Sequence, residues 1–129
     1  MEYIIFRKER MPKSRILAFK PIYKTENSSP YLNLIKDRKI CVESFNTNVE
    51  LTEQVRYLKE VYKDFVELGE WVLSKSIIRS YKPKIDKNNK RYSIIISSPY
   101  INDLRIIFKT EDDMNDVLLK MDEMFNVIW

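Results

Sequence analysis

The hydrophobic residues change their spacing several times along the chain, and these changes predict its secondary structure. Before residue 46 the apolar residues are largely β-branched or aromatic and occur in short runs between polar or Pro-containing segments, as is typical of strands. We expect residues 3–6 and 15–23 to form a hairpin, and residues 31–35 and 39–45 to form two further strands. Four strands are therefore expected before the first helix.

From about residue 49 the apolar spacing becomes helical. Side chains that would share one helix face recur at helical steps: Leu51, Val55, Leu58, Tyr62, Phe65 and Val72. Asn48 and Thr52 are the candidates for the N-cap. Gly69, the only glycine, falls on this face and indicates either a close crossing by another backbone or a helix break. We expect the helix to continue to about residue 78.

The segment SYKPKIDKNNKRYSIIISS, residues 80–98, predicts a basic hairpin with arms at residues 80–85 and 92–97. Pro83 suits an edge strand because it donates no backbone hydrogen bond. A further strand is expected at residues 104–109, and Thr110 with Asp113 resembles a capping box that opens a second helix. This helix is expected to end at or near Trp129, with its apolar face formed by Met114, Leu118, Met121, Phe125 and Ile128.

The predicted element order is β-β-β-β-α-β-β-β-α, with strands joined mainly by short turns. This order favours an α+β fold in which a mainly antiparallel sheet of about five to six strands carries two amphipathic helices on one face. A chain of 129 residues fits one domain. We therefore expect residues 1–129 to form a single α+β domain.

The composition excludes several kinds of active site. The chain has no histidine, one cysteine and one glycine, so it cannot supply a Ser-His or Cys-His nucleophile, the usual zinc ligands or a glycine-rich phosphate loop. One catalytic alternative remains, a metal-dependent nuclease that uses Asp37 and Glu26 with Lys39 orienting a water. Because Asp37 falls in an expected turn, we expect a protein that is not an enzyme and uses no metal or cofactor.

The chain has no apolar run of the length that a membrane span or signal-peptide core requires. A single cysteine, Cys41, agrees with a reducing compartment. We therefore expect a cytoplasmic protein that does not interact with membranes. A composition rich in Lys, Asn and Ile is common in AT-rich coding sequences, which favours a virus or mobile element as its source.

Charge alternates between the predicted strands and the predicted helices. Lys and Arg outnumber Asp and Glu by ten to four in residues 1–40 and by nine to two in residues 71–109. The balance reverses to three against seven in residues 41–70 and to one against six in residues 110–129. If the helices cover one face of the sheet, the other face is positive and suits a phosphate backbone.

The candidate binding residues form two basic clusters with three tyrosines. The first cluster is the hairpin, with Lys82, Lys84, Lys87, Lys90 and Arg91, and the second is Arg7, Lys8, Arg10, Lys13 and Arg15. Aromatic rings among cations suit base stacking, which makes Tyr81, Tyr92 and Tyr100 candidates, although the same rings suit packing at the edge of the core. Whether the clusters adjoin cannot be read from the sequence.

The leading hypothesis is a small non-enzymatic binding protein that contacts nucleic acid (DNA or RNA), or a nucleic-acid-handling protein machine, through basic β-hairpins. The alternative is a protein-binding inhibitor or adaptor that docks on an acidic partner. The apolar residues of the C-terminal helix suit packing against the sheet, as a helix beside a sheet must bury one face, and their broad face also suits a homodimer or a docked protein: Met114, Met121, Met124, Phe125 and Trp129.

Overall fold

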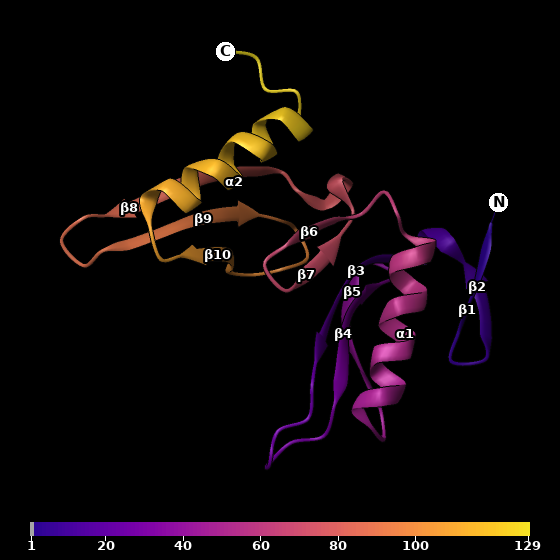
Figure 1. Cartoon of the computed structure of the whole chain (residues 1–129). Helices are drawn as coiled ribbons and strands as arrows, with labels where there is room; N and C mark the ends of the chain where they lie inside the picture. The colour runs from indigo at the N-terminus through magenta and orange to yellow at the C-terminus, as the bar shows by residue number, and fades with distance from the viewer. Residues whose placement is uncertain (1) are drawn as a thin grey trace. The chain divides into compact units, whose positions relative to one another are not determined.

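The computed structural model describes residues 2–129 and contains, within them, ten strands and two helices. All strand pairs are antiparallel and form sheets of two, five and three strands, which confirms the predicted α+β class. The sequence analysis expected a single sheet of five to six strands, whereas the structure distributes its strands among three sheets. The chain divides into two compact units, Met1–Ile77 and Ile78–Trp129, shown in Figure 1 from indigo to yellow.

The first unit is built on a five-stranded sheet in the order β5-β4-β3-β7-β6. Its strands are β3 (Ile16–Ile22), β4 (Tyr31–Lys36), β5 (Lys39–Ser44), β6 (Val66–Leu68) and β7 (Trp71–Leu73). A separate hairpin of β1 (Tyr3–Phe6) and β2 (Glu9–Pro12) precedes the sheet, and α1 (Asn48–Val61) follows β5. Short 3-10 turns occupy Lys13–Arg15 and Lys75–Ile77.

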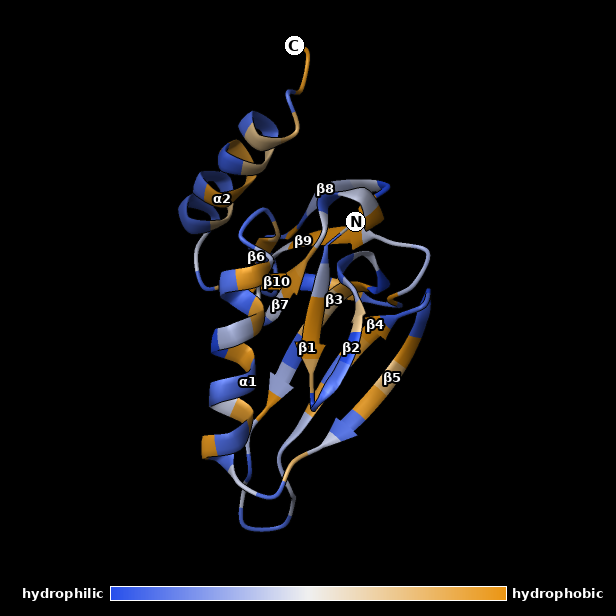
Figure 2. Ribbon diagram, turned by 90° about the vertical axis from the view of Figure 1, so that its right-hand side faces the viewer, coloured by the Kyte–Doolittle hydropathy of each residue, from blue (hydrophilic) through white to orange (hydrophobic). Residues whose placement is uncertain are grey.

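One face of the five-stranded sheet is covered by α1 and the β1–β2 hairpin (Figure 2). Phe19, Leu32 and Leu34 of the sheet are fully buried there. The core is completed by Leu51, Val55 and Leu58 of α1 and by Ile4, Phe6 and Met11 of the hairpin. Each such side chain contributes about 1.5–3 kcal/mol when fully buried, so this cluster holds the first unit together.

The first helix is shorter than predicted. α1 ends at Val61, and the chain turns at Tyr62 into the β6–β7 hairpin, so the expectation of a helix to residue 78 is wrong. Val66 and Leu68 are buried while Glu67 between them is exposed, which is the alternation of a strand. The apolar residues of this segment therefore fit a strand as well as they fit a helix. Gly69 lies in the turn with a φ of 64°, a conformation that favours glycine.

The start of α1 also differs from the prediction. Thr47 is the N-cap, because its side-chain oxygen accepts a hydrogen bond from the Glu50 amide at 3.2 Å. Asn48, one of the two predicted caps, instead accepts a hydrogen bond from the Lys24 amide at 2.7 Å. The cap therefore lies one residue earlier in the chain than Asn48.

The first predicted hairpin is paired differently. β1 pairs with β2 across a two-residue turn, Arg7 and Lys8, both with positive φ, and β3 pairs with β4 and β7 instead. Met11 is fully buried, which explains why a segment that reads as a polar turn forms a strand. As a result five strands precede α1 where four were expected, and five rather than three lie between the helices.

The second unit follows the prediction closely. It contains β8 (Ser80–Asp86), β9 (Arg91–Ser97), β10 (Leu104–Phe108) and α2 (Glu111–Met124), with the strand order β10-β9-β8. The Thr110 hydroxyl accepts a hydrogen bond from the Asp113 amide at 3.1 Å, so the predicted N-cap is confirmed. α2 ends at Met124, earlier than expected, and the side chain of Trp129 is 92% exposed.

Gly69→Ala should lower the free energy of unfolding by about 1–2 kcal/mol, because an L-residue with a Cβ is disfavoured at positive φ. Gly69→Asn should cost less, since asparagine tolerates this conformation. Urea denaturation followed by the fluorescence of the nearby Trp71, in a Trp129→Phe background, measures the effect. An unchanged midpoint for Gly69→Ala would show that the turn does not require glycine.

Candidate nucleic-acid interface

The three-stranded sheet of the second unit has one face covered by α2, as Figure 1 shows. Ile94 and Ile96 of β9 are 0% and 3% exposed, and Met114 and Met121 of α2 are also buried. Because side chains alternate across a strand, burial of these two isoleucines places their neighbours in the sequence on the opposite face. That opposite face is the one that α2 leaves uncovered.

The strand register defines the residues of this uncovered face, which we call the open face. Ile95 of β9 lies opposite Lys82 of β8 and Arg105 of β10, and Ser93 lies opposite Lys84 and Ile107. Adjacent strands lie about 4.8 Å apart, and residues two apart along a strand are separated by about 6.6 Å. The open face therefore consists of Lys82, Lys84, Ser93, Ile95, Arg105 and Ile107, with the backbone positions of its cations within about 12 Å of one another.

The turn between β8 and β9 is ordered by Asp86. Its carboxylate accepts hydrogen bonds from the Asn89 side-chain amide at 2.8 Å and from the Asn89 backbone amide at 3.3 Å. Both hydrogen bonds hold the pKa of Asp86 below its ordinary value, and the bond from the Asn89 side chain has the larger effect. The turn thus presents Lys87 and Lys90, both exposed, at the end of the open face.

The cations of the β8–β9 hairpin are not paired with acids in the described part of the chain. Among residues 2–129, no ion pair involves the exposed hairpin side chains Lys82, Lys84, Lys87, Lys90 and Arg91. Arg105 is the exception on the open face, because its guanidinium contacts Asp103. On the other side of the sheet, residues 111–124 carry six acidic side chains and one lysine. The second unit is therefore positive on its sheet face and negative on its helix.

The three candidate tyrosines do not join the lysines on the open face. Tyr81 lies on the α2 side, where its hydroxyl donates a hydrogen bond to Asp122 at 2.8 Å and its ring packs 5.4 Å from that of Phe125. Burial is the main cause that raises the pKa of Tyr81 to about 12, and the hydrogen bond to Asp122 contributes to this rise. Tyr92 has the register of the α2 side as well, and Tyr100 lies in the segment between β9 and β10.

In the first unit, two arginines of the second basic cluster have partners within the fold. The Arg7 guanidinium lies 4.5 Å from the centre of the Phe45 ring and donates a hydrogen bond to the Ser44 carbonyl oxygen at 2.6 Å. Arg15 donates two hydrogen bonds to Asp37, at 2.7 and 2.5 Å. The bond from Arg15 lowers the pKa of Asp37. Both guanidinium groups thus bind protein groups before any ligand arrives.

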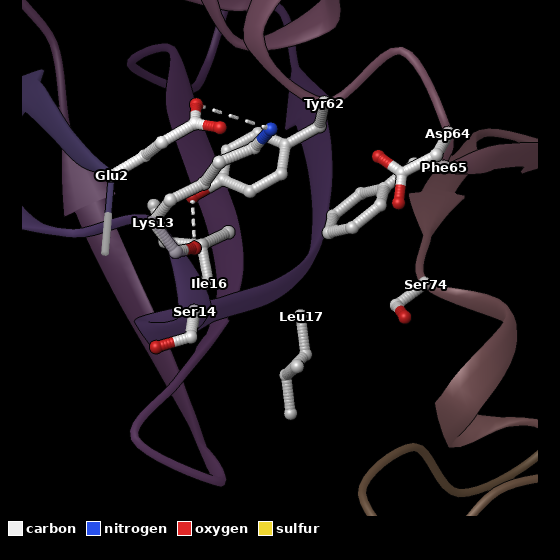
Figure 3. Close-up of a pocket in the computed structure, with 9 residues that line it drawn as sticks. All are labelled: Glu2, Lys13, Ser14, Ile16, Leu17, Tyr62, Asp64, Phe65 and Ser74. Atoms are coloured by element: carbon white, nitrogen blue, oxygen red, sulfur yellow. Dashed lines mark hydrogen bonds and ion pairs between the residues drawn. The ribbon is translucent and has the colours of Figure 1, made fainter.

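Lys13 of the same cluster lines a pocket of about 360 Å³ in the first unit (Figure 3). Its ammonium lies 3.9 Å from the Glu2 carboxylate and 5.8 Å from the centre of the Tyr62 ring. The Tyr62 hydroxyl donates to the Lys13 carbonyl oxygen at 2.7 Å, and its ring stacks on Phe65 at 4.5 Å. Burial raises the pKa of Tyr62.

Lys8 and Arg10 remain exposed, with Arg10 donating to the Lys8 carbonyl oxygen at 3.0 Å.

The carboxylate proposed for a metal-dependent nuclease, Asp37, is bound by an arginine. Asp37 lies in the β4–β5 turn, and both of its oxygens accept hydrogen bonds from Arg15. Within residues 2–129, no three acidic or cysteine side chains lie close enough together to hold a metal ion. No helix in the same range is both long enough and apolar enough to cross a membrane.

Sequence reasoning missed four members of the open face: Ser93, Ile95, Arg105 and Ile107. The positions of Arg105 and Ile107 follow from the pairing of β10 with β9, which depends on contacts across a turn of six residues. The alternation of buried and exposed residues in β9 was the available signal, but it does not reveal which strand lies alongside. Comparison with protein-family models, curated proteins and solved structures found no match to this chain.

Asn89→Ala should raise the pKa of Asp86 toward the ordinary value of about 3.9, because it removes the hydrogen bond that most favours the charged form. Since the folded pKa lies below the unfolded one, the carboxylate stabilises the turn above about pH 4 and loses this effect as the pH falls through the folded pKa. An NMR titration of the Asp86 carboxyl carbon measures the shift. Asn88→Ala is the matched control, because Asn88 interacts through its backbone amide alone and the pKa should stay low.

Proposed function

We propose that this chain is a small non-enzymatic binding protein that holds nucleic acid, DNA or RNA, through the open face and the β8–β9 turn. The observation that supports this most directly is a group of four exposed lysines that form no ion pair with any residue from 2 to 129: Lys82, Lys84, Lys87 and Lys90. The nucleic acid is either free or part of a machine that handles it.

The physical basis is phosphate neutralisation. Lysines that contact phosphates release condensed counterions, which supplies binding free energy that does not depend on base sequence. The acidic side chains of α2 lie on the other side of the same sheet, so a polyanion is attracted to the open face and repelled by the helix. This charge distribution orients the second unit on its ligand.

The placement of the tyrosines changes the expected mode of binding. Tyr81 is engaged by Asp122 and Phe125, and Tyr92 lies on the α2 side of the sheet, so neither ring shares the open face with Lys82 and Lys84. Base stacking requires an exposed ring beside the phosphate contacts. We therefore base the proposal on contacts to the backbone, with little preference for unpaired bases.

Composition adds two further proposals. The single cysteine, Cys41, supports action in a reducing compartment such as the cytoplasm. The absence of histidine together with abundant Lys, Asn and Ile supports a virus or mobile element as the source.

Charge reversal of Lys84, Lys87 and Lys90 to Glu should weaken binding to any nucleic-acid sequence by at least about tenfold and flatten the plot of log affinity against log salt by about 2–3 units. The melting temperature should change little, because exposed charges contribute little to stability. Fluorescence anisotropy with labelled duplex and single-stranded oligonucleotides over a salt series measures both quantities.

The matched control reverses three exposed lysines elsewhere, Lys24, Lys63 and Lys120, which changes the net charge by the same amount. It should retain most of the affinity and the original slope. Equal losses in the two triple variants would show that net charge alone attracts nucleic acid, and no loss in either would reject the open face as the binding surface.

A second candidate function is a protein-binding inhibitor or adaptor that docks on an acidic partner. Ile107 favours it, because this side chain is 75% exposed at the edge of the basic open face. Apolar side chains surrounded by charges are typical of protein interfaces.

Ile107→Ser distinguishes the two functions. It should leave affinity for oligonucleotides unchanged, since the side chain offers nothing to phosphates, but should weaken an interface with protein because the hydroxyl replaces buried apolar surface. Pull-down from nuclease-treated lysate with wild type and Ile107→Ser measures the difference. A protein retained equally by both would contradict the adaptor function for this face.

A further inference from the structure

β5 is the outermost strand of the five-stranded sheet, and one of its edges pairs with no other strand in the part of the chain that the structure describes. It is joined to β4 by a two-residue turn between Lys36 and Lys39. The two residues that flank such a turn bond to each other through both of their backbone N–H and C=O groups, so the backbone groups of Lys39 point toward β4. Alternation then directs the amides of Lys39, Cys41 and Glu43 toward β4. The Phe45 amide, next in this series, donates to the Pro30 carbonyl oxygen at 3.0 Å, as this alternation requires.

The same alternation directs the N–H and C=O groups of Ile40 and Val42 toward the free edge. Both side chains lie on one face of the strand and are 55% and 57% exposed. Figure 2 shows the middle of β5 as hydrophobic, with hydrophilic colour toward its two ends. An edge that offers unpaired backbone groups beside exposed apolar side chains is a template for another strand.

One of the two edge strands of the other unit, β8, is built differently. β8 carries Pro83 at its centre, which offers no backbone donor, and exposed lysines at positions 82 and 84. Proline and lysine are the residues that proteins use to block strand addition at a sheet edge. β5 contains no proline, and a lysine occurs only at its first residue.

We propose that β5 pairs with β5 of a second copy of this chain, antiparallel and centred on Cys41. The segment Lys39-Ile40-Cys41-Val42-Glu43 is self-complementary about that centre. A two-fold axis at Cys41 places Ile40 opposite the partner's Val42, and Lys39 opposite the partner's Glu43. Unlike charges and apolar residues thus meet in the same register.

Charge within the β4–β5 hairpin also favours this partner. Lys39 lies directly opposite Lys36, and like charges at opposed positions destabilise a strand pair. Among residues 2–129, Lys39 has no ion pair, so the partner's Glu43 supplies the missing opposite charge. Glu43 contacts Arg7 at 3.3 Å and Lys36 at 3.8 Å, one through each carboxylate oxygen, and each oxygen has a second acceptor site.

The neighbouring register fits less well. An axis at Val42 would place Ile40 opposite the partner's Ser44 and Cys41 opposite the partner's Glu43. Val42 would then meet its own copy, but Ile40 would lose its apolar partner and Lys39 would have no acid opposite it. It would also require the Ser44 carbonyl oxygen, which already accepts a hydrogen bond from Arg7 at 2.6 Å. The register centred on Cys41 uses only the free backbone groups of Ile40 and Val42.

This register brings the two Cys41 thiols together at a pair that does not exchange backbone hydrogen bonds. The Cα atoms of such a pair lie about 4.5 Å apart, within the range of about 4.4–6.8 Å that a disulfide spans. Diamide, which takes up one electron and one proton from each thiol, should therefore convert wild type into a disulfide-linked dimer. Burial raises the pKa of Cys41, so the reaction is run at mildly alkaline pH, where more thiolate is present.

Sedimentation velocity of the full chain over a concentration series should show a monomer–dimer equilibrium. Lys39→Glu should raise the dimer dissociation constant about tenfold, equivalent to about 1.4 kcal/mol, because two acids then oppose each other at both ends of the strand pair. The double variant Lys39→Glu, Glu43→Lys should recover most of that affinity. Val42→Lys should abolish both the dimer and the diamide cross-link, with circular dichroism used to verify folding.

Leu119→Lys is the matched control, because Leu119 of α2 is 56% exposed, like Ile40 and Val42, and belongs to the helix whose apolar residues also suit a homodimer. It should leave the dimer unchanged. Loss of the dimer in Leu119→Lys but not in Val42→Lys would assign dimerisation to the C-terminal helix and overturn the proposal for β5. A wild-type chain that stays monomeric at its highest soluble concentration would overturn it as well.

Discussion

The two-residue alternation of β9 is the constraint on which the candidate interface depends. Ile94 and Ile96 are buried on the side of α2, and the residues paired with Ile95 and Ser93 must then lie on the opposite side. A shift of one residue would direct Lys82 and Lys84 to the side that α2 covers and would turn Ile94 and Ile96 out of the core. The apolar requirement of the core therefore determines where the cations lie.

The same alternation determines what β5 offers at its edge. Cys41 faces the core cluster that α1 and the β1–β2 hairpin cover, and this leaves Ile40 and Val42 on the other face with their backbone groups directed outward. Arg7 limits the free edge at one end by binding the Ser44 carbonyl oxygen and stacking on Phe45. The β4–β5 turn limits it at the other end. The free stretch is therefore short, which suits a single strand pair with a fixed register.

The signals that were read correctly are local, but the N-cap of α1, the first hairpin turn and the spacing shared by a helix and a strand were misread. The turn after β8 and the Thr110 cap depend on residues within a few positions of each other, and both are found as predicted. Phe65 and Val72 fit a helix and a strand equally well, and only the positive φ at Gly69 and the burial of Val66 show which forms. The positions of Arg105 and Ile107 required the register between β9 and β10, which is a property of tertiary pairing.

The two proposals support each other through the number of binding surfaces. Strand pairing through β5 uses no residue of β8 or of the β8–β9 turn, because those residues belong to a different sheet. Each particle would then carry two open faces. Once one face has bound a long polyanion, the other meets it at a raised effective concentration, provided that both faces can reach the same molecule. A protein of this kind holds long nucleic acid more tightly than either face alone, while an oligonucleotide too short to reach both faces gains nothing from dimerisation.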